Sequence, residues 1–328
     1  MPLTLHRLLA GLPSGRLAAA RKAEKGLVAA GSGLNLLRFD PTKTTLLRQA
    51  FTASVRRRFA RLRRHVRQFF HTDVLGLKPR GALFFMAVPN PRAYEFATDP
   101  QKVAAFRAWL DQQIEEDIFT IEQTETWQAP LGSMAIGPWT THYVGSAYKR
   151  GLANAYLASR VLADITQAQA EFIRSMMTSP ERMSKVILLG TRAFEGMKGI
   201  TSTMAAEMSR TLAEGLIDGL GVIEIGNLLV ERVGLAEARA LMVARTEIIH
   251  AHAEGQLDAF TELGVQELGL QAEWSTAGDD RVCPVCAELE GKVFTVEEAR
   301  GKIPQHPNCR CSWLPAVAGG SNARSAST

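Results

Sequence analysis

The sequence predicts a mainly α-helical protein with a small α+β Cys/His module near its C-terminal end. Between residues 140 and 264, apolar residues recur almost throughout at the three- and four-residue spacing of helices. After Gly264 the pattern changes to short strand-like pieces separated by glycine turns. All four cysteines of the 328-residue chain lie in this last part, between residues 283 and 311.

The composition is that of a chain that can bury a core. Apolar residues make up 46% and charged residues 22%, so global disorder is not expected. No apolar run reaches about 18 residues, and we expect no membrane partner. Because the first residues lack the apolar core of a secretory signal, the clustered cysteines suggest a reducing compartment and a metal rather than disulfides.

Charge and local composition divide the chain into four parts. We expect a basic arm with an Arg-rich amphipathic helix over 1–74, and a helical body over 75–264. A Cys/His α+β module follows over 265–315, with a disordered tail over 316–328. The arm holds 15 Lys/Arg against 3 Asp/Glu, whereas the remainder carries a net charge of −7. Such asymmetry indicates contact with nucleic acid or with an acidic protein surface.

The arm ends in a helix that Asp40-Pro41 should start. Its apolar residues form one stripe: Leu47, Phe51, Val55, Phe59, Leu62, Val66 and Phe69. Arginines occupy the other faces, and no acid lies between Asp40 and Asp73. These arginines either form a solvated face or bind double-stranded DNA or an acidic partner through phosphate or carboxylate groups. The candidate contact residues are Arg56, Arg57, Arg58, Arg61, Arg63, Arg64 and Arg67.

The remaining elements are expected in the following order. A short helix near 17–27 precedes the Arg-rich helix, and a strand over 82–88, a helix over 99–116 and a loop over 127–138 follow it. Five helices should form the body, over 143–165, 167–177, 180–215, 222–233 and 235–263. Glycines separate the last three of them, with a turn around Gly219 and a break at Gly234. In the module, a strand should lead into a short helix that Thr295 and Glu298 begin with a capping box.

The cysteines and one histidine have the spacing of a metal site. Cys283 and Cys286 are two thiols on one tight turn, and His306, Cys309 and Cys311 follow after 19 intervening residues. Four of these five side chains could close a tetrahedral structural zinc site. Two alternatives stay open, namely a pair of disulfides and a reduced, hydrogen-bonded cluster without metal.

An enzymatic alternative uses part of the same residues. His252-Ala-Glu254 upstream of Cys283 and Cys286 resembles the zinc deaminases, in which a histidine and two cysteines hold zinc and a glutamate moves protons. The pattern departs from theirs because Val282 stands where they have proline, and Cys309 and Cys311 would have no role. We expect His252 to be a surface residue instead. No phosphate loop or nucleophile elbow is present, and no enzymatic activity is expected.

The C-terminal third resembles a known family. "ALMVARTEIIHAHAEGQLDAF" is followed by "EWSTAGDDRVCPVCAELEGKVF" and "IPQHPNCRCSWLP". An Ala-Arg-Thr-Glu helix, a Trp–Asp–Arg-Val-Cys-x-x-Cys segment and a His-Pro-Asn-Cys-Arg-Cys segment occur in this order in the head morphogenesis proteins of tailed phages. These are the minor capsid proteins named after protein F of phage Mu. The clear resemblance covers about 235–315.

The resemblance implies a minor head protein, present in few copies and associated with the portal, that acts in capsid assembly and in DNA packaging or ejection. The implied partners are the phage portal protein, other capsid proteins and double-stranded DNA. The implied location is the virion head or neck, with the host cytoplasm as the site of assembly. An Arg-rich arm and a helical body agree with such contacts.

Overall fold

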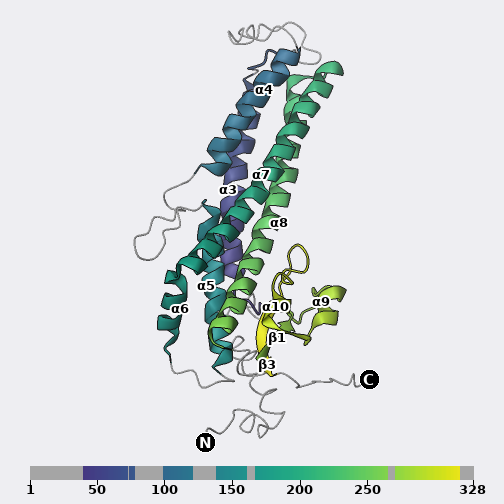
Figure 1. Cartoon of the computed structure of the whole chain (residues 1–328). Helices are drawn as coiled ribbons and strands as arrows, with labels where there is room; N and C mark the ends of the chain where they lie inside the picture. The colour runs from purple at the N-terminus through teal and green to yellow at the C-terminus, as the bar shows by residue number, and fades with distance from the viewer. Residues whose placement is uncertain are drawn as a thin grey trace, which may run out of the picture.

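The structure is a computed structural model that describes residues 40–72, 74–77, 99–120, 138–160, 167–264 and 270–317. Long helices form a bundle, and a small module with three strands lies beside the lower part of its last helix (Figure 1). The mainly α fold with a C-terminal region of strands is therefore confirmed. The bundle elements are α3 (Thr45–His71), α4 (Asp99–Ile114), the π-helix η3 (Glu115–Phe119), α5 (Thr140–Ser159), α6 (Gln169–Thr178), α7 (Pro180–Ile217) and α8 (Val222–Glu262).

The Arg-rich helix α3 lies within the bundle, where it packs along α8. Its predicted apolar stripe is buried from Phe51 to Phe69, while Leu47 is partly buried. The helix begins at Thr45 rather than at Asp40-Pro41. Asp40 still caps it from outside, because its carboxylate accepts hydrogen bonds from the Thr45 backbone N–H (2.7 Å) and from the Arg48 guanidinium (3.0 Å).

The glycines between the body helices behave in two ways. Gly219 has a φ of +67° and forms the turn between α7 and α8, as predicted. The predicted break at Gly234 is wrong, because α8 runs through it without interruption. A glycine inside a helix costs about 1 kcal/mol relative to alanine. The burial of Val233 and Ala236 on either side offsets that cost and holds the helix together.

The module is built on an antiparallel sheet with the strand order β2-β1-β3. The strands are β1 (Leu270–Ser275), β2 (Val293–Phe294) and β3 (Ser312–Val317), with the short helices α9 (Pro284–Leu289) and α10 (Val296–Ala299) between them. Trp274 on β1 pairs with Trp313 on β3, and both indoles are fully buried. The predicted capping box of Thr295 and Glu298 is present at the start of α10.

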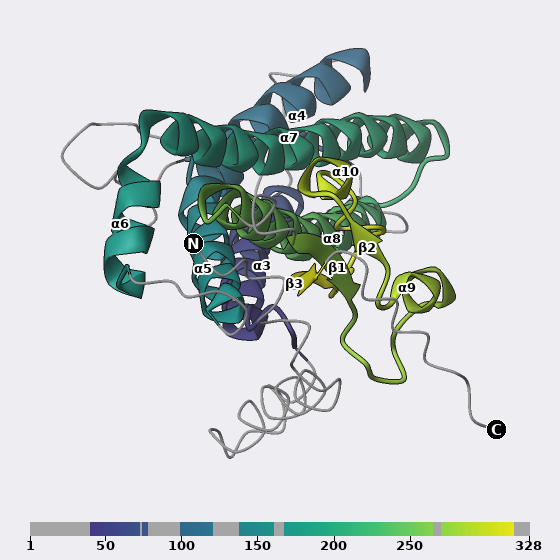
Figure 2. The same ribbon diagram turned by 60° about the horizontal axis from the view of Figure 1, so that its bottom comes forward.

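The module docks on the C-terminal half of α8 (Figure 2). The backbone N–H and C=O of Trp274 form hydrogen bonds with Lys292 and Gly291, just before β2. Trp274 and its partner Trp313 are therefore a non-hydrogen-bonded pair, and the backbone N–H and C=O of Trp313 point away from β1. The buried side chain of Gln256 on α8 meets them. Its amide donates to the Trp313 carbonyl at 2.8 Å and accepts from the Trp313 N–H at 3.0 Å. A helix side chain thus closes the outer edge of the sheet.

Some predicted features lie outside the described residues. These are the helix near 17–27, the strand over 82–88, nearly all of the loop over 127–138, and the tail beyond residue 317. Ala316 and Val317, which were assigned to the tail, belong to β3. Within the described parts of the chain, none of the helices combines the length and the apolar character that crossing a membrane requires.

Candidate metal centre and its surroundings

Two loops of the module carry the predicted ligands, and we call residues 279–286 the first ligand loop and residues 305–311 the second. In the first, Cys283 is the N-cap of α9 and Pro284 its first residue, a position that suits the fixed φ of proline. The backbone N–H of Cys286 donates to the Cys283 sulfur at 3.4 Å. The tight turn predicted from Cys-x-x-Cys is therefore formed.

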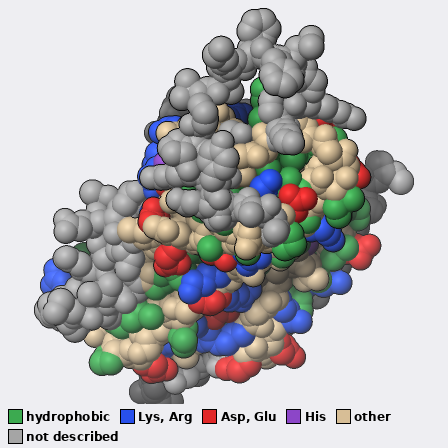
Figure 3. All heavy atoms as spheres, turned by 90° about the horizontal axis from the view of Figure 1, so that it is seen from above, with side chains coloured by type: hydrophobic (Ala, Val, Ile, Leu, Met, Phe, Trp, Pro, Cys, Tyr) green, Lys and Arg blue, Asp and Glu red, His purple; other side chains and the backbone are tan. Residues whose placement is uncertain are grey.

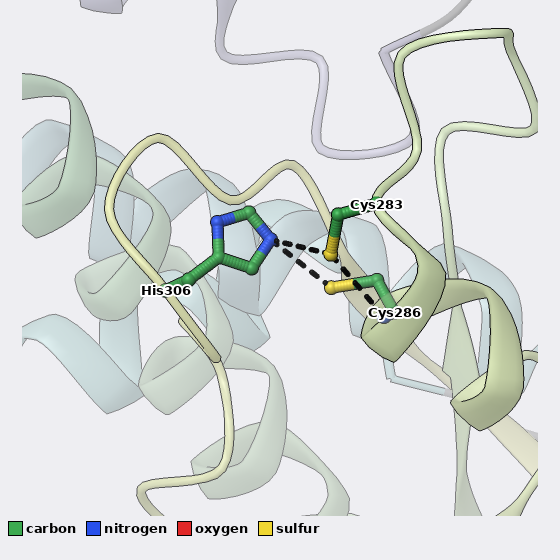
Figure 4. A group of neighbouring side chains, drawn as sticks. All are labelled: Cys283, Cys286 and His306. Carbon is green, nitrogen blue, oxygen red and sulfur yellow. Dashed lines mark hydrogen bonds between the residues drawn. The ribbon is translucent and has the colours of Figure 1, made fainter.

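The histidine of the second ligand loop points at both of these thiols (Figure 4). Nε2 of His306 lies 3.2 Å from the Cys283 sulfur and 3.3 Å from the Cys286 sulfur. Nδ1 of His306 lies 2.8 Å from the Pro307 carbonyl, which can only accept a hydrogen bond. Nδ1 must therefore carry a proton, and in the neutral imidazole Nε2 keeps the lone pair that a metal-binding histidine uses.

Cys309 and Cys311 complete the cluster. Their sulfurs and that of Cys286 lie within 4.8 Å of one another, and the same limit holds for the group of Cys283, Cys286 and His306. Cys286 thus belongs to both groups. All four cysteines are free thiols, and Cys286, Cys309 and Cys311 are buried. The structure therefore brings the five predicted ligands into two overlapping groups of three, and either group could hold a metal ion.

The pKa shifts of the cluster differ from one thiol to the next. Burial, with the nearby Cys309 as a further cause, raises the pKa of the Cys286 thiol to about 12. A hydrogen bond from Cys311 lowers the pKa of Cys309 and raises that of Cys311 in return. Thiols held protonated by burial and by their neighbours release protons when a cation binds. Thiolates with one neutral imidazole are the donors that zinc prefers at structural sites, so the residues present fit this ion.

An ion pair joins the two ligand loops. Arg310, which lies between the two cysteines of the second loop, donates to both carboxylate oxygens of Asp279 at 2.6 and 2.7 Å. Asp279 also accepts from the backbone N–H of Arg281 at 3.2 Å. The Arg310 hydrogen bond is the largest cause that lowers the pKa of Asp279 to about 2. Sequence reasoning did not single out Asp279 as part of the site.

Helix α8 holds the second ligand loop from the other side. The hydroxyl of Thr246 accepts a hydrogen bond from the backbone N–H of Asn308 at 3.1 Å. Arg245 lies 3.4 Å from the Asn308 side-chain oxygen. Asn308 has a φ of +61°, a left-handed conformation that asparagine tolerates better than most residues. Two separate parts of the sequence motif, the Ala-Arg-Thr-Glu helix and the His-Pro-Asn-Cys-Arg-Cys loop, are therefore in direct contact.

His252 and Glu254, which the deaminase alternative requires together with Cys283 and Cys286, are not part of this cluster. His252 is fully buried rather than on the surface, and its Nε2 accepts from the Asn154 amide at 2.9 Å. Burial lowers its pKa to about 3 and keeps it neutral. Glu254 pairs with Lys185 and Arg300 instead. Among the described residues, neither His252 nor Glu254 belongs to a group that could hold a metal.

One predicted contact arginine lies inside the protein. Arg58 is 2% exposed, and its guanidinium stacks 4.0 Å from the centre of the Trp139 ring. It donates to the carbonyls of Ile118 and Thr120 at 3.1 and 3.2 Å. These carbonyls lie at the end of η3, where a helix presents partial negative charge. Arg58 stabilises the bundle from within and does not lie on a surface that a partner could reach.

Two more arginines of α3 are engaged within the chain. Arg61 donates to the Asp117 carbonyl at 3.0 Å, and Arg63 forms an ion pair with Glu237 on α8. The density of arginines on this helix is thus partly explained by internal partners. The remaining predicted contact residues are exposed: Arg56, Arg57, Arg64 and Arg67.

Known proteins match the part of the chain that carries this arrangement. Residues 206–314, from the last part of α7 through α8 and the module, match the family model of Phage Mu protein F like protein. The chain therefore resembles the Mu F-type head morphogenesis proteins, as its motifs predicted. The minor head protein GP7 of Bacillus phage SPP1 is 28% identical over 126 residues. The match covers 34% of this chain and 41% of that protein, and no solved structure is significantly similar.

Proposed function

We propose that the chain is a minor head protein of a tailed phage that associates with the portal and acts in capsid assembly, without enzymatic activity. One observation carries this proposal. The three motif segments of the family meet in space, because the α8 residues Arg245 and Thr246 contact Asn308, and Arg310 contacts Asp279. In this chain the motif segments therefore form one structural unit. Virion location and a role in packaging or ejection follow from the same proposal.

Within this function, the Cys/His cluster would hold a structural zinc ion. Cys283, Cys286 and His306 would supply three ligands, and Cys309 or Cys311 the fourth. A bound ion would join the two ligand loops, which are separated by β2 and α10 in the chain. Its chemistry would be that of a closed tetrahedral centre, which stabilises a fold and leaves no open position for a substrate.

The exposed arginines of α3 would contact double-stranded DNA or an acidic surface of the portal. Arg56 and Arg67 are 11 residues apart, which spans about 16 Å along a helix at 1.5 Å per residue. Arg57 and Arg64 lie beside them on one side of the helix, and the sequence of α3 contains no acidic residue. The view onto the end where α7 meets α8 shows described side chains of both charges mixed together (Figure 3). Of these two surfaces, the exposed face of α3 is therefore the better candidate for contact with DNA or an acidic portal surface.

Co-expression with the portal and major capsid proteins tests the assembly role. We expect the chain to sediment with proheads and to remain bound to portal rings in pull-down experiments. A chain that stays at the top of the gradient and binds neither protein would refute portal association.

A charge-matched comparison tests the arginine face. In one variant Arg56, Arg64 and Arg67 become alanine, and in the control Arg174, Arg210 and Arg239 do. If α3 contacts phosphates, only the first variant loses DNA affinity, and wild-type affinity falls by orders of magnitude between about 50 and 200 mM salt. Equal losses in the two variants would mean that net charge alone governs binding. Loss of portal binding with no change toward DNA would identify the portal as the partner of this face.

A further inference from the structure

The two ligand loops have little regular structure of their own to hold them. The first is a turn followed by the six-residue helix α9, and the second consists of turns and bends. A metal centre binds its ion more tightly when its ligands are held near the bound geometry. The groups that fix these loops are therefore part of the centre, even if they never touch the ion.

The Thr246 hydroxyl uses both of its hydrogen-bonding roles to fix the second ligand loop. It donates to the Met242 carbonyl one turn earlier in α8, at 2.8 Å. This bond orients the oxygen so that it can accept from the backbone N–H of Asn308. Asn308 lies between two candidate ligands, and the N–H of Cys309 donates to the His306 carbonyl at 3.1 Å to close the turn. Thr246 thus sets the position of the loop that carries three of the five donors.

The Asp279–Arg310 pair fixes the second ligand loop to the first. Arg310 makes a two-pronged contact with one carboxylate, and both side chains are mostly shielded from solvent, at 16% and 7% exposure. The Asp279 carbonyl also accepts from the N–H of Val282 at 3.2 Å, which folds the chain just before Cys283. The pair therefore sets how far Cys283 lies from the donors of the second loop.

We infer that Thr246 and the Asp279–Arg310 ion pair are positioning residues of the metal centre, and that Thr246 couples ion binding to the docking of the module on α8. The inference rests on the proposed zinc site. A residue that orients a metal ligand without touching the ion typically changes metal affinity by about 10- to 100-fold when its contact is removed. Zinc would bind more tightly when α8 holds the loop, and by linkage would hold the module more tightly on α8.

Zinc affinity of the full chain, measured by competition with a chromophoric chelator, tests the inference. We expect Thr246→Val to weaken zinc binding by about 10- to 100-fold, and Thr246→Ser, which keeps the hydroxyl, to restore it. Thr203→Val is the matched control. Thr203 is exposed on α7, and its hydroxyl makes the same bond to the carbonyl four residues earlier, at 2.9 Å. For the ion pair, Asp279→Asn is compared with Asp111→Asn, which breaks the exposed pair with Arg107.

A spectroscopic readout separates positioning from general stability. With Co²⁺ in place of zinc, the visible absorption bands report the ligand geometry, so Thr246→Val and Asp279→Asn should change the bands while both controls leave them unaltered. Thermal melts should show a larger loss in the zinc-loaded than in the zinc-free variants. Wild-type protein that binds no zinc would overturn the metal site and this inference together. Tight zinc binding with unchanged affinity and spectra in the Thr246 and Asp279 variants would overturn the inference alone.

Discussion

Gly151 on α5 and Gly255 on α8 lie at the closest approach of these two helices. A methyl group added at Gly151 would lie 2.1 Å from the backbone oxygen of His252, and one at Gly255 would lie 2.3 Å from that of Tyr148. Neither oxygen can move without shifting its helix. The two glycines thus let the helices approach backbone to backbone, and α8 reaches the module from a fixed position.

Gly255→Ala should therefore destabilise the protein. A new methyl group in a closed contact typically costs about 1–3 kcal/mol, and contact with rigid backbone favours the upper end. The matched control is Gly199→Ala in α7, where no atom lies within 4 Å of the new methyl group. That variant should gain about 0.5–1 kcal/mol from helix propensity. Urea denaturation measures both, and equal effects would contradict the close packing.

The contrast between these glycines shows what periodicity can and cannot predict. The apolar stripe of α3 was predictable because burial requires one face of a helix, and the spacing of Phe51, Val55 and Phe59 fixes which face. Whether a glycine ends a helix, as near Gly219, or lies inside one, as Gly234 does, depends on what packs against it. That information is not local in the sequence.

The same limit applies to the site. The five donors were predictable because each group of ligands lies within six residues of chain. The burial of Arg58 was not predictable, since its carbonyl partners lie about 60 residues away. His252 was misassigned to the surface for the same reason, because its partner Asn154 comes from another helix. The contribution of Thr246 became visible only when α8 and the second ligand loop were seen in contact.

Asp258 is the centre of a buried ionic cluster, and its replacement should be costly. Its carboxylate accepts from Tyr148 at 2.7 Å and from Lys185 at 2.8 and 3.0 Å, and it pairs with Arg182 and Arg300. Arg300 belongs to the module, so the cluster also joins the module to the bundle. Asp258→Asn should cost about 3 kcal/mol, the lower end for a broken buried ion pair, because its carboxylate is buried but its three cationic partners remain partly exposed to water. The exposed Asp111→Asn should change the free energy of unfolding by less than about 1 kcal/mol.

The Asp258 carboxylate should also make the stability of the protein depend on pH, with a loss of stability in acid. Burial alone would raise the pKa of Asp258, but the charge and hydrogen bonds of Lys185, with Tyr148 and Arg300, outweigh it and hold the folded pKa below the ordinary value. The stabilisation is then complete above the unfolded pKa of about 4 and is lost as pH falls through the folded pKa. The stability gap between wild type and Asp258→Asn should therefore shrink below about pH 4. A gap that stays constant down to pH 2 would contradict this assignment.

Gln256→Ala should loosen the module from α8. The substitution leaves the backbone N–H and C=O of Trp313 without partners at a buried sheet edge. Each unsatisfied group should lower the free energy of unfolding by about 1–3 kcal/mol. Because Trp313 and Trp274 are both buried, their fluorescence should shift to the red as the edge opens. Gln112→Ala, which removes an exposed amide on α4, serves as the control. Unchanged fluorescence and stability in Gln256→Ala would show that water replaces the amide at little cost.

Removal of zinc should unfold the module and leave the bundle folded. In the proposed site the ion would cross-link the two ligand loops, and structural zinc contributes on the order of 10 kcal/mol in small domains. Most of the buried core lies in the bundle, from Phe51 on α3 to Phe260 on α8, and it continues into the module at Trp274 and Trp313. A strong chelator should therefore abolish the near-ultraviolet signal of Trp274 and Trp313, while far-ultraviolet helicity falls only slightly. Zinc should restore the signal in wild type but not in Cys286→Ser, because Cys286 belongs to both donor groups. A tryptophan signal that survives chelation, with zinc shown to have left, would mean that contacts with α8 alone hold the module together.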